Sequence, residues 1–142
     1  VSGEDLKLYY KIAKDKEIPQ LEKTTIQQAK LFFNEVLKDL INFCVKNKLT
    51  NWQNVFQGAL NYLSNEKNSS YLIREYLPEN CFNLEAAGIL AASDQAWVFV
   101  GMGSWNDIVG VSDYDLYLSL TDRLYDIICN SLVAAINSYP SQ

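Results

Sequence analysis

Apolar residues in the first half of the chain recur every three or four positions, the spacing of one face of an α-helix. The clearest case begins at a Thr24-x-x-Gln27 capping pattern and ends near Lys46 and Lys48, where cations oppose the helix dipole. The expected buried positions are Ile26, Ala29, Phe33, Val36, Leu37, Leu40, Ile41 and Cys44, with Phe32 and Phe43 widening the face. We expect this helix to be central to the fold.

Further helices are predicted on both sides of this segment. Residues 4–15 form a candidate first helix, and a Thr50-x-x-Gln53 pattern predicts the start of a third. The polar run 64–70 ends the third helix, and a short helix is expected at 70–76. The expected buried positions of the third helix are Trp52, Val55, Phe56, Ala59, Leu60 and Leu63.

The second half of the chain predicts two more helices separated by a glycine-rich loop. The run LEAAGILAAS after Asn83 is apolar and small enough for close packing. The short WVFV segment at 97–100 is either a buried extended segment or the end of that helix. Residues 101–110 then form a loop, and the last helix runs from Ser112 or Asp113 to about Asn137. The loop glycines are Gly101, Gly103 and Gly110.

The predicted fold class is mainly α. With 142 residues, 49 % of them apolar, the chain can bury one core without a disulfide or a metal. We therefore predict a single helical domain over residues 1–142, a bundle of about five to six helices, with the segment at 97–100 as its one candidate extended stretch.

Charge is distributed unevenly along this chain. Residues 1–76 carry a net charge of +2, whereas residues 77–142 contain one basic residue, Arg123, and a net charge of −7. Such an acidic half repels phosphate backbones, which argues against nucleic-acid binding, and attracts a cationic partner. In the alternative interpretation, these charges only keep the surface hydrated.

Several kinds of chemistry are excluded by composition. Without histidine, neither a Cys/His zinc site nor a Ser–His or Cys–His nucleophile pair can form. The Gly101-Met-Gly103 turn lacks the third glycine and the lysine of phosphate-binding loops. The cysteines (Cys44, Cys81 and Cys129) lie in apolar contexts and are expected to be reduced core residues. No apolar signal region or membrane-length run is present, so we expect a cytoplasmic protein with no cofactor, metal or membrane contact.

The last helix carries an acidic face opposite an apolar one. Asp115, Ser119, Asp122 and Asp126 share one side, and the opposite side holds Leu116, Leu120, Leu124, Ile127 and Ala135. The acidic side is either an ordinary hydrated face or a docking surface for a basic partner. Asp113 and Asp115 also suit the first turn of a helix. A metal site formed by Asp107, Asp113 and Asp115 remains an alternative, although the spacing does not match an EF-hand.

The loop before this helix offers a second candidate contact. Glycines permit close backbone approach, and Trp105 is of the type enriched at binding hot spots. Asn106 and Asp107 are polar neighbours that can contact a partner. In the alternative interpretation, Trp105 packs inward while Asn106 and Asp107 fix the turn.

The string FVGMGSWND at 99–107, followed by an acidic helix that ends in Ala-Ala-x-Asn at 134–137, resembles the C-terminal signature of small bacterial proteins. These are the immunity proteins of polymorphic and contact-dependent toxin systems. The resemblance implies a non-enzymatic cytoplasmic protein that binds and occludes a cognate toxin domain. Such domains are often cationic, which agrees with the acidic half of the chain.

We therefore expect an acidic binding protein without catalytic residues, whose partner is a basic protein domain. The expected partner-binding residues are Trp105, Asn106, Asp107, Asp113, Asp115, Asp122 and Asp126. Two alternatives remain open: a small-molecule or metal-dependent enzyme with a pocket beside the 101–107 loop, and a structural or adaptor subunit. The oligomeric state is open as well.

Overall fold

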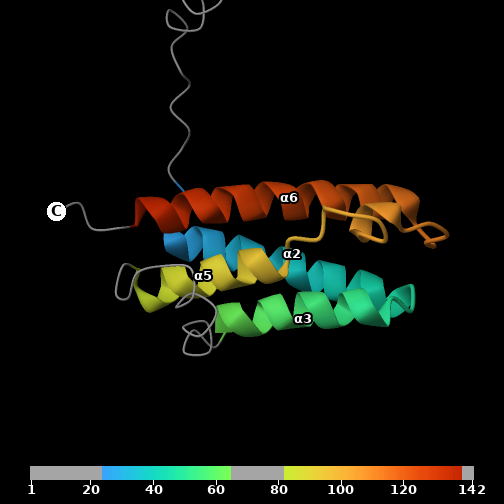
Figure 1. Ribbon diagram of the computed structural model, residues 1–142, viewed down its shortest axis with the longest axis horizontal. Helices are drawn as coiled ribbons and strands as arrows, with labels where there is room; N and C mark the ends of the chain where they lie inside the picture. The colour runs from blue at the N-terminus through green and yellow to red at the C-terminus, as the bar shows by residue number, and fades with distance from the viewer. Residues whose placement is uncertain (1–23, 65–81, 139–142) are drawn as a thin grey trace, which may run out of the picture.

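The computed structural model describes residues 24–64 and 82–138, and within them the chain is mainly α-helical and contains no strand (Figure 1). The predicted fold class is therefore confirmed. The predicted helices at 4–15 and 70–76 lie outside the described residues. The described elements are the helices α2 (Ile26–Lys46), α3 (Thr50–Ser64), α5 (Leu84–Gln95) and α6 (Tyr114–Asn137), with a single 3-10 turn, η1 (Trp105–Asp107).

Helix α2 begins one residue later than the sequence predicted. Its N-cap is Thr25, whose Oγ1 accepts a hydrogen bond from the Gln28 amide at 3.2 Å, while the Thr25 amide donates to Gln28 Oε1 at 3.0 Å. The capping box is therefore formed by Thr25 and Gln28, and the prediction of Thr24 and Gln27 was wrong. Lys48 lies beyond the helix with a φ of 58°, in the turn that leads to α3.

Helix α2 packs along both α3 and α6 (Figure 1), but each of the four described helices packs along two neighbours in the same way, so α2 is one member of the bundle and the prediction that it is central is not confirmed. Every predicted core position on it is buried except Ile41, which is half-buried. Of the two residues expected to widen the face, Phe43 is buried, whereas Phe32 is 49 % exposed. The buried face of α2 therefore extends beyond the predicted core positions at Phe43 but not at Phe32.

The start of α3 differs from the prediction. Thr50 is the first helical residue rather than the cap, and the Gln53 amide donates to the carbonyl of Leu49 at 2.9 Å. The Leu49 amide in turn donates to the Cys44 carbonyl at 2.9 Å, so the turn after α2 leads directly into α3. The predicted face is buried at Phe56, Ala59 and Leu63 and half-buried at Trp52, Val55 and Leu60.

Helix α5 begins as predicted at Asn83, whose Oδ1 accepts a hydrogen bond from the Ala86 amide at 2.8 Å. The helix packs against both α3 and α6, and its small side chains permit burial on several sides. Its buried residues are Ala86, Ala87, Gly88, Ile89, Ala91, Ala92 and Ser93. None of the four described helices combines the length and apolarity that a membrane crossing requires.

The WVFV segment at 97–100 does not continue α5, which ends at Gln95 with Ala96 as its C-cap. It is irregular, with Val98 buried and Phe99 half-buried, and it pairs with no strand in the described part of the chain. The Trp105 amide donates to the Val98 carbonyl at 3.1 Å, which folds the glycine loop back on this segment. The segment thereby places the loop beside the start of α6 (Figure 1).

Candidate binding surface on the last helix

Trp105 is a core residue. Its side chain is 0 % exposed and is the largest of the fully buried side chains in the described residues. Four aromatic rings surround it, with centroid distances of 5.1 Å to Phe56, 5.3 Å to Tyr117, 5.7 Å to Trp52 and 6.3 Å to Phe43. The structure therefore shows the inward-packed alternative, and the expectation that Trp105 offers an exposed contact is corrected.

Two hydrogen bonds attach Trp105 to α6. Its Nε1 donates to Thr121 Oγ1 at 2.8 Å, and the Tyr117 hydroxyl donates to the Trp105 carbonyl at 2.7 Å. Burial raises the pKa of Tyr117 above its ordinary value, with smaller contributions from Tyr114 and Asp107. The hydroxyl therefore keeps its proton and remains a donor, so the loop is held firmly against the helix.

Asn106 and Asp107 fix the loop while remaining exposed. Asp107 Oδ2 accepts a hydrogen bond from the Gly103 amide at 2.7 Å, and Asn106 Nδ2 donates to the Phe99 carbonyl at 3.4 Å. Gly103 has a φ of 76°, in the left-handed region that favours glycine. Both polar side chains thus hold the turn, as the alternative interpretation required, and each still reaches the surface.

Asp113 is the N-cap of α6, and its Oδ1 accepts a hydrogen bond from the Leu116 amide at 2.9 Å. This bond confirms the predicted start of the helix and gives the carboxylate a structural role. The neighbouring Ser112 amide donates to Asn47 Oδ1 at 2.7 Å, which ties the start of α6 to the end of α2. Asp113 therefore has a structural role in the fold, as Trp105 does, although its side chain remains exposed.

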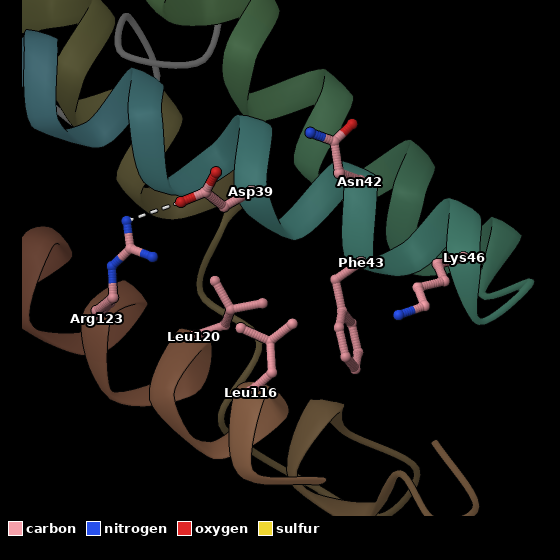
Figure 2. Close-up of a pocket in the computed structure, with 7 residues that line it drawn as sticks. All are labelled: Asp39, Asn42, Phe43, Lys46, Leu116, Leu120 and Arg123. Atoms are coloured by element: carbon pink, nitrogen blue, oxygen red, sulfur yellow. Dashed lines mark ion pairs between the residues drawn. The ribbon is translucent and has the colours of Figure 1, made fainter. Parts of the chain in front are cut away.

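We call Asp115, Asp122 and Asp126 the acidic ridge. All three are exposed on α6, and no ion pair or hydrogen bond of their side chains is present among the described residues. The single basic residue of α6, Arg123, is paired with Asp39 of α2 at 2.9 Å (Figure 2). The cation nearest in sequence is therefore engaged elsewhere, and the charge of the acidic ridge is not compensated.

An open hollow of about 490 Å³ lies beside the acidic ridge, and we call it the aromatic hollow. It adjoins the glycine loop and combines ring faces with carboxylates. Its lining residues are Phe99, Asn106, Thr121, Asp122, Tyr125 and Asp126. The structure thus brings together Asn106 and two aspartates of the acidic ridge, while Asp113 and Asp115 lie outside this hollow.

The aromatic part of this surface was not predicted from the sequence. Trp97, Phe99 and Tyr125 form a cluster with ring centroids 5.3 to 6.1 Å apart, and we call it the aromatic cluster. Trp97 and Tyr125 are 44 % and 49 % exposed. The sequence did contain one indication that Tyr125 lies near the acidic ridge. Tyr125 directly precedes Asp126 and follows Asp122 by three residues, a spacing that places residues close together on one helix.

A second hollow, the α2–α6 groove, lies on the other side of the acidic ridge and measures about 360 Å³. Figure 2 shows Phe43 pointing from α2 toward α6, with Leu116 and Leu120 opposite. Leu116, predicted to lie on the apolar face of the last helix, is 40 % exposed and lines this groove. Lys46 and Arg123 line it too, so the groove is less suited to a basic partner.

Metal-ligating and thiol groups each support a particular chemistry. No three Cys, Asp or Glu side chains among residues 24–64 and 82–138 lie close enough together to hold a metal ion. Burial raises the pKa of Cys44 from 9.0 to about 12, so this thiol stays protonated and inert at neutral pH. Cys129 is also free, and Cys81 lies outside the described residues.

No protein-family model, curated protein sequence or solved structure matches this chain significantly. The surface of α6 and of the segment that precedes it carries an uncompensated acidic ridge, an aromatic cluster that is exposed at Trp97 and Tyr125, and the aromatic hollow.

Proposed function

We propose that this chain is a non-enzymatic binding protein that docks a cationic protein domain on α6 and on the loop that precedes it. The observation that carries the proposal is the acidic ridge, three exposed carboxylates without a neutralising partner, next to the exposed rings of the aromatic cluster. Protein interfaces commonly combine aromatic contacts with a charged surround of this kind.

The two parts of the surface contribute in different ways. Long-range attraction between the acidic half of the chain, with its net charge of −7, and a basic domain raises the association rate. Aromatic side chains that lose their contact with water upon binding slow dissociation instead. We assign the second role to Trp97 and Tyr125 in place of Trp105, because only the first two are exposed.

The partner class that fits best is a bacterial toxin domain, which would make the chain a cytoplasmic immunity protein. Two features support this proposal: the resemblance carried by FVGMGSWND at 99–107, and the acidic surface. Inhibition would occur by occlusion, since an acidic surface that covers the basic substrate-binding face of a nuclease blocks access of the phosphate backbone.

The direct experiment uses the genomic neighbourhood. We expect the reading frame to follow a gene for a large secreted protein with a variable C-terminal domain. That C-terminal domain should co-purify with this chain and lose its toxicity when the two are co-expressed. A matched domain from an unrelated strain serves as the control. Co-expression that leaves the toxicity unchanged, together with no complex by size-exclusion chromatography, would contradict the proposal.

A further inference from the structure

We infer that the aromatic hollow receives an arginine side chain of the partner protein. This inference rests on the proposed function and adds the chemistry of the group that is recognised. Three properties of the hollow carry it: aromatic side chains in its lining, two uncompensated carboxylates in its lining, and walls that are held in place by hydrogen bonds.

The aromatic faces come from Phe99 and Tyr125, whose ring centroids are 5.6 Å apart at an interplanar angle of 78°. Edge-to-face packing leaves part of a ring face uncovered, and the Tyr125 side chain is 49 % exposed. A guanidinium group stacks on such a face within about 6 Å of the ring centroid. Both rings line the hollow, so a cation that enters it comes into contact with aromatic side chains.

The carboxylates of Asp122 and Asp126 belong to successive turns of α6 and line the same hollow. A planar guanidinium offers several N–H donors in a fixed fork and can bond a carboxylate while stacking on an aromatic ring. An ammonium group is a compact, strongly hydrated charge and gains less from the ring face. The combination therefore favours arginine over lysine.

The walls of the hollow are organised before any partner binds. Thr121 Oγ1 accepts from Trp105 Nε1 at 2.8 Å and donates to the Tyr117 carbonyl at 2.7 Å. Asn106 Nδ2 donates to the carbonyl of Phe99 at 3.4 Å. A site that is already ordered loses less entropy when a ligand binds. The buried Trp105 thus supports the hollow from beneath.

The α2–α6 groove provides an internal comparison. It has a similar size, about 360 Å³, and an apolar floor, but Lys46 and Arg123 line it. Like charges disfavour a guanidinium there, and Asp39 is already paired with Arg123 at 2.9 Å. Of the two hollows that flank the acidic ridge, the arginine should therefore enter the aromatic hollow alone.

The test uses Nα-acetyl-arginine amide as the probe and follows the backbone amides of the full chain by two-dimensional NMR. We expect saturable shifts centred on Asn106, Thr121 and Tyr125, with no comparable shift at Lys46 in the groove. The lysine analogue should bind about fivefold more weakly, and the neutral citrulline analogue should not bind measurably. Equal, unsaturated shifts over the whole acidic surface would overturn the inference.

Paired variants assign the effect to named side chains. Tyr125→Ala should weaken the probe about fivefold or more, whereas Tyr114→Ala, an exposed tyrosine of the same helix outside the hollow, should leave it unchanged. The double change Asp122→Asn and Asp126→Asn should abolish binding, and Glu35→Gln on α2 should not alter it. Full binding by Tyr125→Ala, or by the double variant, would overturn the inference even with the fold intact.

Failure of this inference can be distinguished from failure of the proposed function. A cationic domain that is still bound by Tyr125→Ala, and lost upon charge reversal in the acidic ridge, would refute the arginine site and leave the docking surface standing. If both Tyr125→Ala and the charge-reversal variant fail to bind the cationic domain, the result supports the arginine site and the docking surface together.

Discussion

Replacing Trp105 by alanine should destabilise the fold by about 4 kcal/mol, within the range for removal of a buried Trp or Phe side chain. The structure justifies a value in that range. The side chain is 0 % exposed, and its ring lies 5.1 to 6.3 Å from four other aromatic rings contributed by α2, α3 and α6. No smaller residue can refill that space without moving three helices.

A second substitution separates the ring from its polar group. Trp105→Phe keeps an aromatic side chain but removes the donor to Thr121 Oγ1, a bond of 2.8 Å. This hydrogen bond is part-buried, so its loss should cost about 1 kcal/mol, and the smaller ring leaves a void that adds to the loss. We therefore expect Trp105→Phe to lie between the wild type and Trp105→Ala.

The assay is urea unfolding followed by far-ultraviolet circular dichroism, with the half-exposed Trp97→Ala as the matched control. A chain of this size has about 5 to 15 kcal/mol of stability, so a loss of about 4 kcal/mol shifts the midpoint clearly. Trp97→Ala should cost about 1 kcal/mol. Equal losses in the two alanine variants would refute the assignment of Trp105 to the core.

Two further predictions concern single groups. Asp113→Ala should lower the free energy of unfolding by about 1 kcal/mol in the same urea assay, because it removes the N-cap of α6. Asp115→Ala, a control in the first turn of the same helix, should lower the free energy of unfolding by less. Burial raises the pKa of Cys44 from 9.0 to about 12, so the thiol loses its proton at a lower pH in the unfolded state than in the folded state. The free energy of unfolding should therefore fall above pH 9, by about 1.4 kcal/mol per pH unit. Unfolding curves at pH 8 and pH 10 should therefore differ more for the wild type than for Cys44→Ala, and parallel changes would contradict this.

Periodic apolar spacing was sufficient to predict the helical core. The buried face of α2 and the start of α6 at Asp113 follow from local sequence, because a 3.6-residue period and a capping side chain act within one helix. The exact first and last residues of the helices were harder to predict from the sequence. Two adjacent threonines, Thr24 and Thr25, offer the same capping group, and the spacing of the apolar face does not distinguish them.

The start of α3 shows a different limit. Lys48 adopts a φ of 58°, a conformation in which glycine or asparagine is expected, and it shortens the connection between the two helices. The Leu49 carbonyl then accepts the first hydrogen bond, which leaves Thr50 inside the helix. Nothing in the local sequence indicates a left-handed lysine, so the capping pattern at Thr50 was misleading.

The candidate surface was predictable only in part. The exposed position of the acidic ridge follows from α6 alone, whereas the burial of Trp105 depends on Phe43, Trp52 and Phe56. These three residues lie about fifty or more positions earlier in the sequence and on two other helices. The aromatic hollow likewise forms only when the segment at 97–100 packs beside α6, and no periodic pattern encodes that contact.

In the proposed function, the acidic ridge docks a cationic protein domain. The most direct measurement is the association rate with the co-encoded toxin domain, by stopped-flow fluorescence at low and at physiological salt. The double variant Asp122→Lys and Asp126→Lys is compared with Glu35→Lys, which changes an exposed carboxylate of α2.

We predict that charge reversal in the acidic ridge slows association about tenfold or more at low salt and less at physiological salt, because ions screen long-range attraction. Glu35→Lys should have a much smaller effect. An association rate that is unchanged in the ridge variant, or slowed equally in both variants, would contradict the claim that this face of α6 receives the partner.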